Sequence, residues 1–404
     1  MSTDSLVTTF IEAALCDARR AEELLASHPE IAGADLYTAL ALGDLERVTR
    51  TLDETPEAIG APGGPRRWKP LLYVCFSQFA NGKSSRAGQL VETARMLLAR
   101  GADPNASYIP EDWPDNPLSC LYGSAGLNNN PALALALLEA GANPNDSESL
   151  YHSTEHDDMA CVKLLLEHGA TPAGTNALKH MLDRQHMEGL RLLLAAGADP
   201  NEVNQRGETA LHWAVWRDRG APVIALLLDS GVTLDARRKD GRTAYAMAVY
   251  SGQGEVAALL RARGANMDLS ELDRFMAACA AADDQQLDRL LAGPPRIAVT
   301  PEDERLLPDL ASAHRTVAVR ALLAAGIPVD ARGELGATAL HWACWKGYAD
   351  LVKLLIDQGA SATIEDAQFH GTPPGWFGHG SQNCAEGNGD YPQVERLLRQ
   401  RGLI

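Results

Sequence analysis

One short pattern, Leu-Leu-x-x-x-Gly-Ala, recurs along the whole chain and restricts the possible folds more than any other feature. It appears as LLARGADPN at 97–105, LLEAGANPN at 137–145 and LLAAGADPN at 193–201, with x-Pro-Asn at its end. The glycines that mark successive copies, strong and weak, are Gly101, Gly141, Gly169, Gly197, Gly231, Gly264, Gly326, Gly359 and Gly402. Their spacing clusters at about 33 residues. Such a period predicts a stack of similar units in place of one globular core.

Each unit is expected to contain two helices. In the segment YADLVKLLIDQG (348–359) the apolar residues cover a wide helical stripe, and Gly359 suits the left-handed cap that ends a helix. An earlier helix in each unit begins at a Thr-Ala-Leu-His position. One such pair cannot bury both of its apolar faces, so neighbouring pairs must stack. We therefore predict an all-α solenoid of about 10–11 helix-turn-helix units, several of them degenerate.

The two starts of a unit that are most alike within this chain are GETALHWAVW at 207–216 and GATALHWACW at 336–345. Together with the Leu-Leu-x-x-x-Gly-Ala pattern, these segments resemble the ankyrin-repeat family, whose repeat carries Gly-x-Thr-Pro-Leu-His-x-Ala-Ala. The strongest matches are 207–234, 241–268 and 336–362, and the resemblance covers nearly the whole chain. Stretches such as GGPRRWKPLLYVCFS (63–77) also look like bacterial multi-repeat members of the family.

Departures from the repeat divide the chain into four expected segments. Residues 1–60 are degenerate capping repeats, and 61–268 are ankyrin-like repeats. Residues 269–326 are degenerate again and stand where a joint, rigid or hinged, would lie. Residues 327–404 are C-terminal repeats with a modified last unit. Insertions between the two helices of a unit are expected at 77–90, 123–131 and 380–390, and a Pro-rich finger between units at 104–117.

The paired Thr and His of these two starts are expected to be structural. Thr209 and Thr338 fit as N-caps, since their hydroxyl groups can accept from the free N–H groups of a helix. In the family, this His bonds the backbone between units, so the resemblance implies that His212 and His341 brace the turn and do not act as catalysts.

The tryptophans that follow are candidates for binding. Trp213 and Trp216 stand three residues apart and share one helix face, and so do Trp342 and Trp345. Mapped onto the ankyrin pattern, Trp216 and Trp345 face the inner groove with Arg217 and Lys346 beside them, whereas Trp213 and Trp342 belong either to the core or to the groove. The residues predicted to bind a partner are Arg206, Trp213, Trp216, Arg217, Lys239, Arg242, Tyr250, Trp342, Trp345 and Lys346, with an adjoining polar patch of His152, Glu155 and His156.

These positions predict the character of the partner. Seven basic and six acidic residues occupy 201–245, in a chain whose net charge is −17. Solvated turns explain part of this excess, and a basic, aromatic groove for an acidic or aromatic polypeptide segment explains the rest. We predict a non-enzymatic scaffold or adaptor that binds a protein through its concave groove and turn tips, with no cofactor.

One motif offers an enzymatic alternative. The stretch HSTEH at 152–156 fits H-x-x-E-H, in which His152 and His156 would hold a zinc ion and Glu155 would act as the base of a hydrolase. That chemistry needs a long helix and a third ligand from a dedicated domain, and a stack of short hairpins supplies neither.

Composition restricts the remaining classes. A net charge of −17 disfavours a grip on nucleic acid or on an anionic membrane surface. No run of about eighteen apolar residues spans a membrane, and the N-terminus lacks the basic start of a secretory signal. Seven cysteines form no C-x-x-C pair, which indicates free thiols in a reducing compartment. We expect a cytoplasmic monomer.

Overall fold

A computed structural model describes residues 3–146, 148–281, 286, 304–324, 326–383 and 389–404. The chain divides into two compact units, Met1–Val232 and Thr233–Ile404, each described here by itself. The division into four segments expected from the sequence remains a prediction. Almost every described element is a helix, so the all-α solenoid predicted from the repeat is confirmed.

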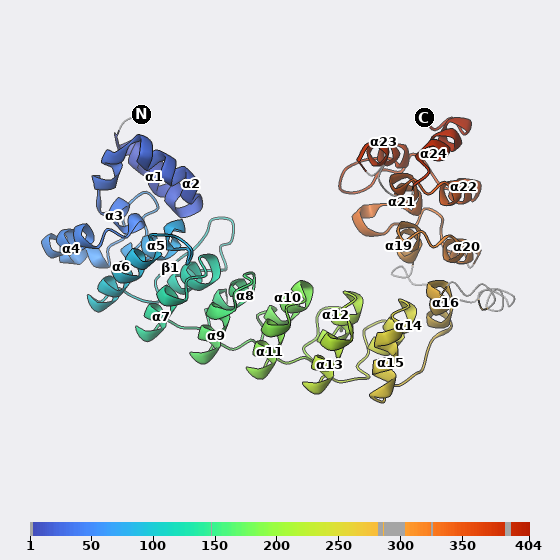
Figure 1. Cartoon of the computed structure of the whole chain (residues 1–404), viewed down its shortest axis with the longest axis horizontal. Helices are drawn as coiled ribbons and strands as arrows, with labels where there is room; N and C mark the ends of the chain where they lie inside the picture. Colours follow the sequence, from blue (N-terminus) through green and yellow to red (C-terminus); the bar gives the residue numbers. More distant parts are fainter. Residues whose placement is uncertain (1–2, 147, 282–285, 287–303, 325, 384–388) are drawn as a thin grey trace. The chain divides into compact units, whose positions relative to one another are not determined.

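The first unit is a stack of seven helix pairs (Figure 1). They are α1 (Thr3–Cys16) with α2 (Ala18–Ser27), α3 (Leu36–Leu42) with α4 (Leu45–Glu54), α5 (Pro70–Phe76) with α6 (Ala87–Ala99), η4 (Tyr122–Leu127) with α7 (Pro131–Glu139), α8 (Ser149–Ser153) with α9 (Ala160–Glu167), α10 (Ala177–Arg184) with α11 (Met187–Ala195), and α12 (Ala210–Trp216) with α13 (Ala221–Asp229). Short 3-10 turns cover Pro29–Gly33 (η1), Pro56–Ile59 (η2) and Gln78–Ala80 (η3). The first helices of successive pairs pack on one another, which makes one layer, and the second helices make the other.

The second unit continues the same architecture. Its elements are α14 (Ala244–Tyr250) with α15 (Gly254–Ala262), α16 (Glu271–Ala281), α19 (Leu306–Ser312) with α20 (Thr316–Ala324), the turn η5 (Glu334–Gly336), α21 (Ala339–Lys346) with α22 (Ala349–Asp357), and α23 (Pro373–Asn383) with α24 (Tyr391–Gln400). With the seven pairs of the first unit, its four complete pairs make eleven among the described residues. Residues 282–285 and 287–303 of the expected joint, and 384–388 of the expected insertion at 380–390, lie outside the described residues.

The recurring pattern has a direct structural meaning. The first leucine of each copy is fully buried in the first unit, at Leu97, Leu137, Leu165, Leu193 and Leu227. The glycine after it adopts a left-handed conformation, as at Gly141 with φ 94°, and so ends the second helix. A single helix pair would leave these leucines exposed to water, whereas stacked pairs bury them and so stabilise one another.

The asparagine of x-Pro-Asn joins each turn to the next one. Asn105 Nδ2 donates to the carbonyl of Gly141 (3.1 Å), Asn145 Nδ2 to that of Gly169 (3.0 Å), and Asn201 Nδ2 to that of Gly231 (3.1 Å). We call these three hydrogen bonds the asparagine bridges. They satisfy glycine carbonyls at helix ends, where no partner within the helix exists.

Two expected irregularities take different forms. The Pro-rich finger closes as a hairpin, because β1 (Ser107–Tyr108) pairs antiparallel with β2 (Leu118–Ser119). The insertion expected at 123–131 is wrong in its first half, since Tyr122–Leu127 forms a π-helical turn of the first helix. Buried Asn128 explains the difference: its Nδ2 donates to the carbonyls of Cys75 (2.9 Å) and Gly123 (3.0 Å), which holds this turn against α5.

No helix in the described parts of the chain is both long and apolar enough to cross a membrane. Among the described cysteines, Cys75, Cys120, Cys161 and Cys344 are buried free thiols and Cys16 is an exposed one. Burial raises the pKa of Cys161 to about 12, so its thiol stays protonated and unreactive.

Candidate binding site

Helix α12 carries two tryptophans, of which Trp216 is exposed and Trp213 is held by a hydrogen bond. Trp213 is half-buried, and its Nε1 donates to Oδ1 of Asp183 on α10, 2.9 Å away. Trp216, one turn later, is 49% exposed and meets the Trp213 ring edge-on at 5.0 Å between centroids. The hydrogen bond fixes Trp213, and Trp213 in turn fixes one edge of Trp216. We call Asp183, Trp213, Trp216 and Arg217 the tryptophan cluster.

Arg217 completes this cluster and is already neutralised. Its guanidinium lies 4.3 Å from the centroid of the Trp216 ring, a cation–π contact. Its Nε lies 2.7 Å from Oδ1 of Asp183. The same carboxylate oxygen therefore holds both Trp213 and Arg217, and the cluster presents an aromatic surface in which the charge of Arg217 is paired.

The other basic residues predicted to bind a partner differ in whether they form ion pairs within the chain. In the second unit, half-buried Arg242 pairs through Nε with Asp273 (2.9 Å) and through Nη1 with Asp240 (3.3 Å), and its guanidinium lies 4.7 Å from the Tyr250 ring centroid. Arg206 and Lys239 are exposed on turns, and the described residues offer neither an ion pair. The charge is thus split between internal pairs and solvated turns.

The second copy of the motif lies in different surroundings. Trp342 and Trp345 each meet the buried ring of Trp376, with centroids 5.2 and 5.4 Å apart, and His379 stacks on Trp345 at 5.0 Å. Trp345 is half-buried as a result, and the adjacent Lys346 is half-buried as well. Because α23 of the next repeat supplies this cover, Trp345 offers much less free surface than Trp216.

The Thr and His of each motif form a reciprocal cap. The Nδ1 atom of His341 accepts from the backbone N–H of Thr338 (3.0 Å), while the Thr338 side chain caps the helix. His341 Nε2 donates to the carbonyl of Gly371 in the following repeat (3.0 Å). Thr209 and His212 make the same cap on α12. Burial lowers the pKa of His341, which favours the neutral ring that this arrangement requires.

The H-x-x-E-H stretch does not present a metal face. Helix α8 ends at Ser153, so Glu155 and His156 lie in the turn beyond it. Both ring nitrogens of His152 face carboxylates, Glu148 at 3.3 Å and Glu155 at 3.2 Å, and Nε2 of His156 bonds the Gly126 carbonyl at 2.6 Å. The described residues contain no group of three or more His, Cys, Asp or Glu side chains placed to hold a metal ion.

A row of aromatic rings that no sequence motif predicts runs from the segment before α5 and strand β1 along the first helices that follow. Successive centroids lie 4.1 to 5.9 Å apart. Its members, which we call the aromatic row, are Trp68, Tyr108, Phe76, Tyr122, His152, Tyr151 and His180. The row ends on α10, one turn before Asp183 of the tryptophan cluster. Its members come from several repeats and share no motif, so only the stacking of the repeats brings them together.

Comparison with known proteins agrees with this architecture. The family model for ankyrin repeats (3 copies) matches residues 178–271 and 275–366. An ankyrin repeat-containing protein of Treponema pallidum (strain Nichols) is 32% identical over 149 residues, which are 37% of this chain and 41% of that protein. The chain thus spans about two fifths of the length of this curated relative.

Solved structures give similar matches. The ankyrin repeat domain from Acinetobacter baumannii AYE is 26% identical, with 49% of this chain and 98% of that chain covered and a TM-score of 0.41. The ankyrin repeat domain of Bcl-3, a member of the IkappaB protein family, is also 26% identical, with 58% and 94% covered and a TM-score of 0.28.

Proposed function

Because this chain is an ankyrin-repeat protein, and ankyrin repeats generally serve as protein–protein interaction modules, we propose that it is an adaptor that binds a partner polypeptide through the tryptophan cluster. The observation that carries the proposal is the exposure of Trp216, 49%, on a side chain that Trp213 and Arg217 hold in place. Tryptophan and arginine dominate binding energy at interfaces, and a fixed side chain loses little entropy when it is covered.

The same contacts favour an aromatic partner segment over an acidic one. An acidic segment would compete with Asp183 for Arg217, which lies 2.7 Å from that carboxylate. An apolar ring needs no such exchange, because it stacks on the open face of Trp216 and extends the edge-on packing already present. The half-buried members of the aromatic row on the neighbouring first helices, Tyr122, Tyr151, His152 and His180, supply further surface of the same character.

A hydrolase at 152–156 receives no such support. The ankyrin fold is typically a non-enzymatic interaction domain. His152 and His156 each bond groups of their own stack, as described above, and their separation between a helix and a turn gives a metal no common face. We therefore assign both side chains to the packing between repeats.

Affinity capture with a matched control tests the proposal. The immobilised chain, its Trp216→Ala variant and its Trp113→Ala variant are exposed to lysate of the source organism, and bound proteins are quantified by mass spectrometry. Trp113 is a suitable control because it is 44% exposed in the finger hairpin of the same unit. We expect Trp216→Ala alone to lower recovery of the partner by about tenfold or more. Equal recovery on all three would contradict the proposal.

A further inference from the structure

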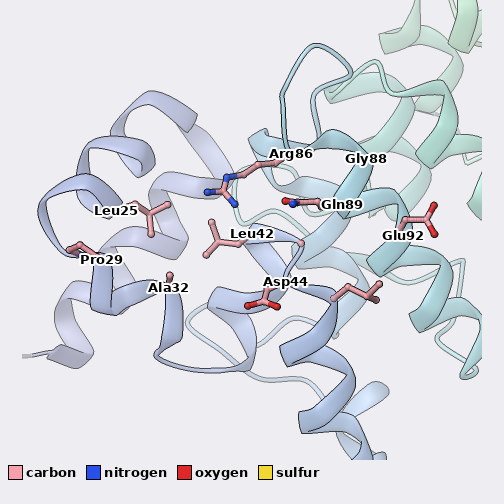
Figure 2. Close-up of a pocket in the computed structure, with 11 residues that line it drawn as sticks. Leu25, Pro29, Ala32, Leu42, Asp44, Arg86, Gly88, Gln89 and Glu92 are labelled. Atoms are coloured by element: carbon pink, nitrogen blue, oxygen red, sulfur yellow. The ribbon is translucent and has the colours of Figure 1, made fainter.

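A groove of about 610 Å³ lies in the first unit, away from the tryptophan cluster (Figure 2). Its apolar side is formed by Leu25, Pro29, Ala32, Leu42 and Leu45. Its other side is formed by the start of α6, with Arg86, Gly88 and Gln89. A volume of this size falls within the range of about 300–1,000 Å³ typical of ligand sites.

Arg86 gives the groove a guanidinium group that forms no ion pair with the described residues. In Figure 2 its side chain extends toward Leu42. The two acidic residues on the rim have other partners: Asp44 caps α4 by accepting from the N–H of Arg47 (3.1 Å), and Glu92 points away from Leu42 and pairs with Arg95 (3.0 Å). Among the described residues Arg86 has no ion pair, although most arginines of the first unit have one.

The segment that carries Arg86 is held firmly. It is the insertion between α5 and α6, and it begins where Ser77 Oγ donates to the carbonyl of Ala41 (2.7 Å). Asn130 of the next repeat donates to the carbonyl of Ala80 (2.7 Å). The guanidinium of Arg86 lies 5.6 Å from the ring centroid of fully buried Phe79. The charge is therefore preorganised, which lowers the entropy lost when a ligand binds.

From these contacts we infer a second binding site, in which Arg86 receives a carboxylate and the leucines on the opposite side receive an aliphatic side chain next to it. A guanidinium matches a carboxylate by paired hydrogen bonds, and the adjoining apolar wall gains from burial. The occupant is a polypeptide segment in which Asp or Glu is flanked by aliphatic residues. Its polypeptide nature rests on the proposed function, whereas the site itself is separate from the tryptophan cluster.

The chain offers a clean way to block this groove. A Cβ atom built on Gly88 meets no heavy atom within 4 Å, and the backbone there is helical, so a larger side chain fits without strain. Gly88→Leu is therefore expected to add an apolar side chain on this side of the groove without straining the backbone. Arg86→Gln removes the charge and keeps a side chain that can form hydrogen bonds.

Calorimetric titration with defined peptides tests the inference. The probes are acetyl-Leu-Glu-Leu-Leu-amide, its Gln counterpart and free octanoate, each added to the full chain and to the Arg86→Gln, Gly88→Leu and Trp216→Ala variants. We expect the Glu peptide to bind the native chain about tenfold more tightly than the Gln peptide, because one charge-assisted interaction is lost. Arg86→Gln should abolish that preference, Gly88→Leu should weaken both peptides, and Trp216→Ala should change neither.

Four results would overturn the inference, three of them with the peptides. These are the absence of binding to the native chain, an equal affinity for the Glu and Gln peptides, and a preference that survives Arg86→Gln. Octanoate binding more tightly than the Glu peptide would also overturn it, by making a small carboxylate the occupant. Since none of these outcomes depends on Trp216, failure here and failure of the proposed function are distinguishable.

Discussion

Trp213 donates its indole N–H to Oδ1 of Asp183, which lies thirty residues earlier in the preceding repeat. The same oxygen lies 2.7 Å from Nε of Arg217, so one carboxylate fixes both neighbours of Trp216. The exposed ring of Trp216 is thus held in part by a residue outside its own repeat, and its orientation depends on the contact between two neighbouring repeats.

Replacing Asp183 with Ala should therefore change both stability and preference. We expect unfolding in urea to become about 1 kcal/mol easier, since Asp183 and its partners are only partly buried and water replaces much of what is lost. The freed Arg217 should also raise the affinity for acidic peptides. Binding of a Glu-containing peptide that is unchanged by Asp183→Ala would show that Arg217 was already available.

The cap formed by Thr338 and His341 should make the second unit sensitive to acid. Burial lowers the pKa of His341 from 6.5, with Asp366 and the Gly371 carbonyl opposing the shift and Arg332 adding to it. The unfolded chain then takes up a proton before the folded chain does. This contribution to stability is fully present above about pH 6.5 and is lost as the pH falls toward the lowered value.

Urea unfolding at pH 7.5 and 5.5 measures this effect. His341→Asn should shrink the difference between the two midpoints, while His370→Ala, at an exposed position, should leave the difference unchanged. If the two variants respond alike, the buried cap is not the source of the acid sensitivity.

Asp366 should be among the most sensitive positions of the second unit. It is 2% exposed and accepts from the N–H groups of Gln368, Phe369 and Gly371 and from Nε1 of Trp376, all within 2.9 Å. We expect Asp366→Ala to cost about 3 kcal/mol or more, because buried donors lose their acceptor, and Asp366→Asn to cost less. Thermal unfolding followed by tryptophan fluorescence measures both.

The same carboxylate adds a second acid transition. Burial alone would raise the pKa of Asp366, but its hydrogen bonds outweigh burial and hold the pKa well below 3.8. Its contribution is present above about pH 4 and is lost as the pH falls through the lowered value. Stability of Asp366→Asn should accordingly vary less than that of the native chain below pH 4.

Two glycines on the groove should respond in opposite ways to alanine. Gly43 ends α3 with φ 72°, and a Cβ there would lie 2.9 Å from the backbone nitrogen of Leu90. Gly43→Ala should cost about 1–3 kcal/mol, whereas Gly88→Ala, in open helical space, should stabilise by up to about 1 kcal/mol. Urea midpoints of the two variants give the comparison, and equal shifts would contradict the packing described around Gly43.

The histidines of the H-x-x-E-H stretch should matter for packing alone. We expect His156→Ala to cost about 1 kcal/mol through loss of its hydrogen bond to the Gly126 carbonyl. Zinc analysis of chelator-washed protein should give the same substoichiometric content for the native chain and for His152→Ala. Stoichiometric zinc that disappears in His152→Ala would instead favour the hydrolase.

The sequence predicts the parts of the molecule that repeat. The glycines and leucines of each copy locate the helix pairs, since their roles depend only on position within one unit. Thr338 and His341 are recognisable for the same reason. Helical spacing also placed Trp213 and Trp216 correctly on one face.

Features that depend on contact between neighbouring repeats were harder to predict. Trp345 and Trp216 occupy the same position of their repeats. Only Trp345 is covered, because Trp376 and His379 of the next repeat pack against it. Asp183 belongs to no motif, and its role emerges only when α10 and α12 are packed together. Arg86 lies in the insertion expected at 77–90, and nothing in the linear chain indicated that leucines lie across the groove from it.

The asparagine bridges bear on how a chain of this kind tolerates change in length. Each bridge joins the turn of one repeat to the glycine that ends the following one, although the three bridges span 36, 24 and 30 residues. The contact is therefore kept when the number of residues within a repeat changes, and gain or loss of a whole repeat leaves every donor opposite an acceptor. Genes encoding such stacks can therefore grow and shrink by complete modules, with the hydrogen bonds at each new junction already in register.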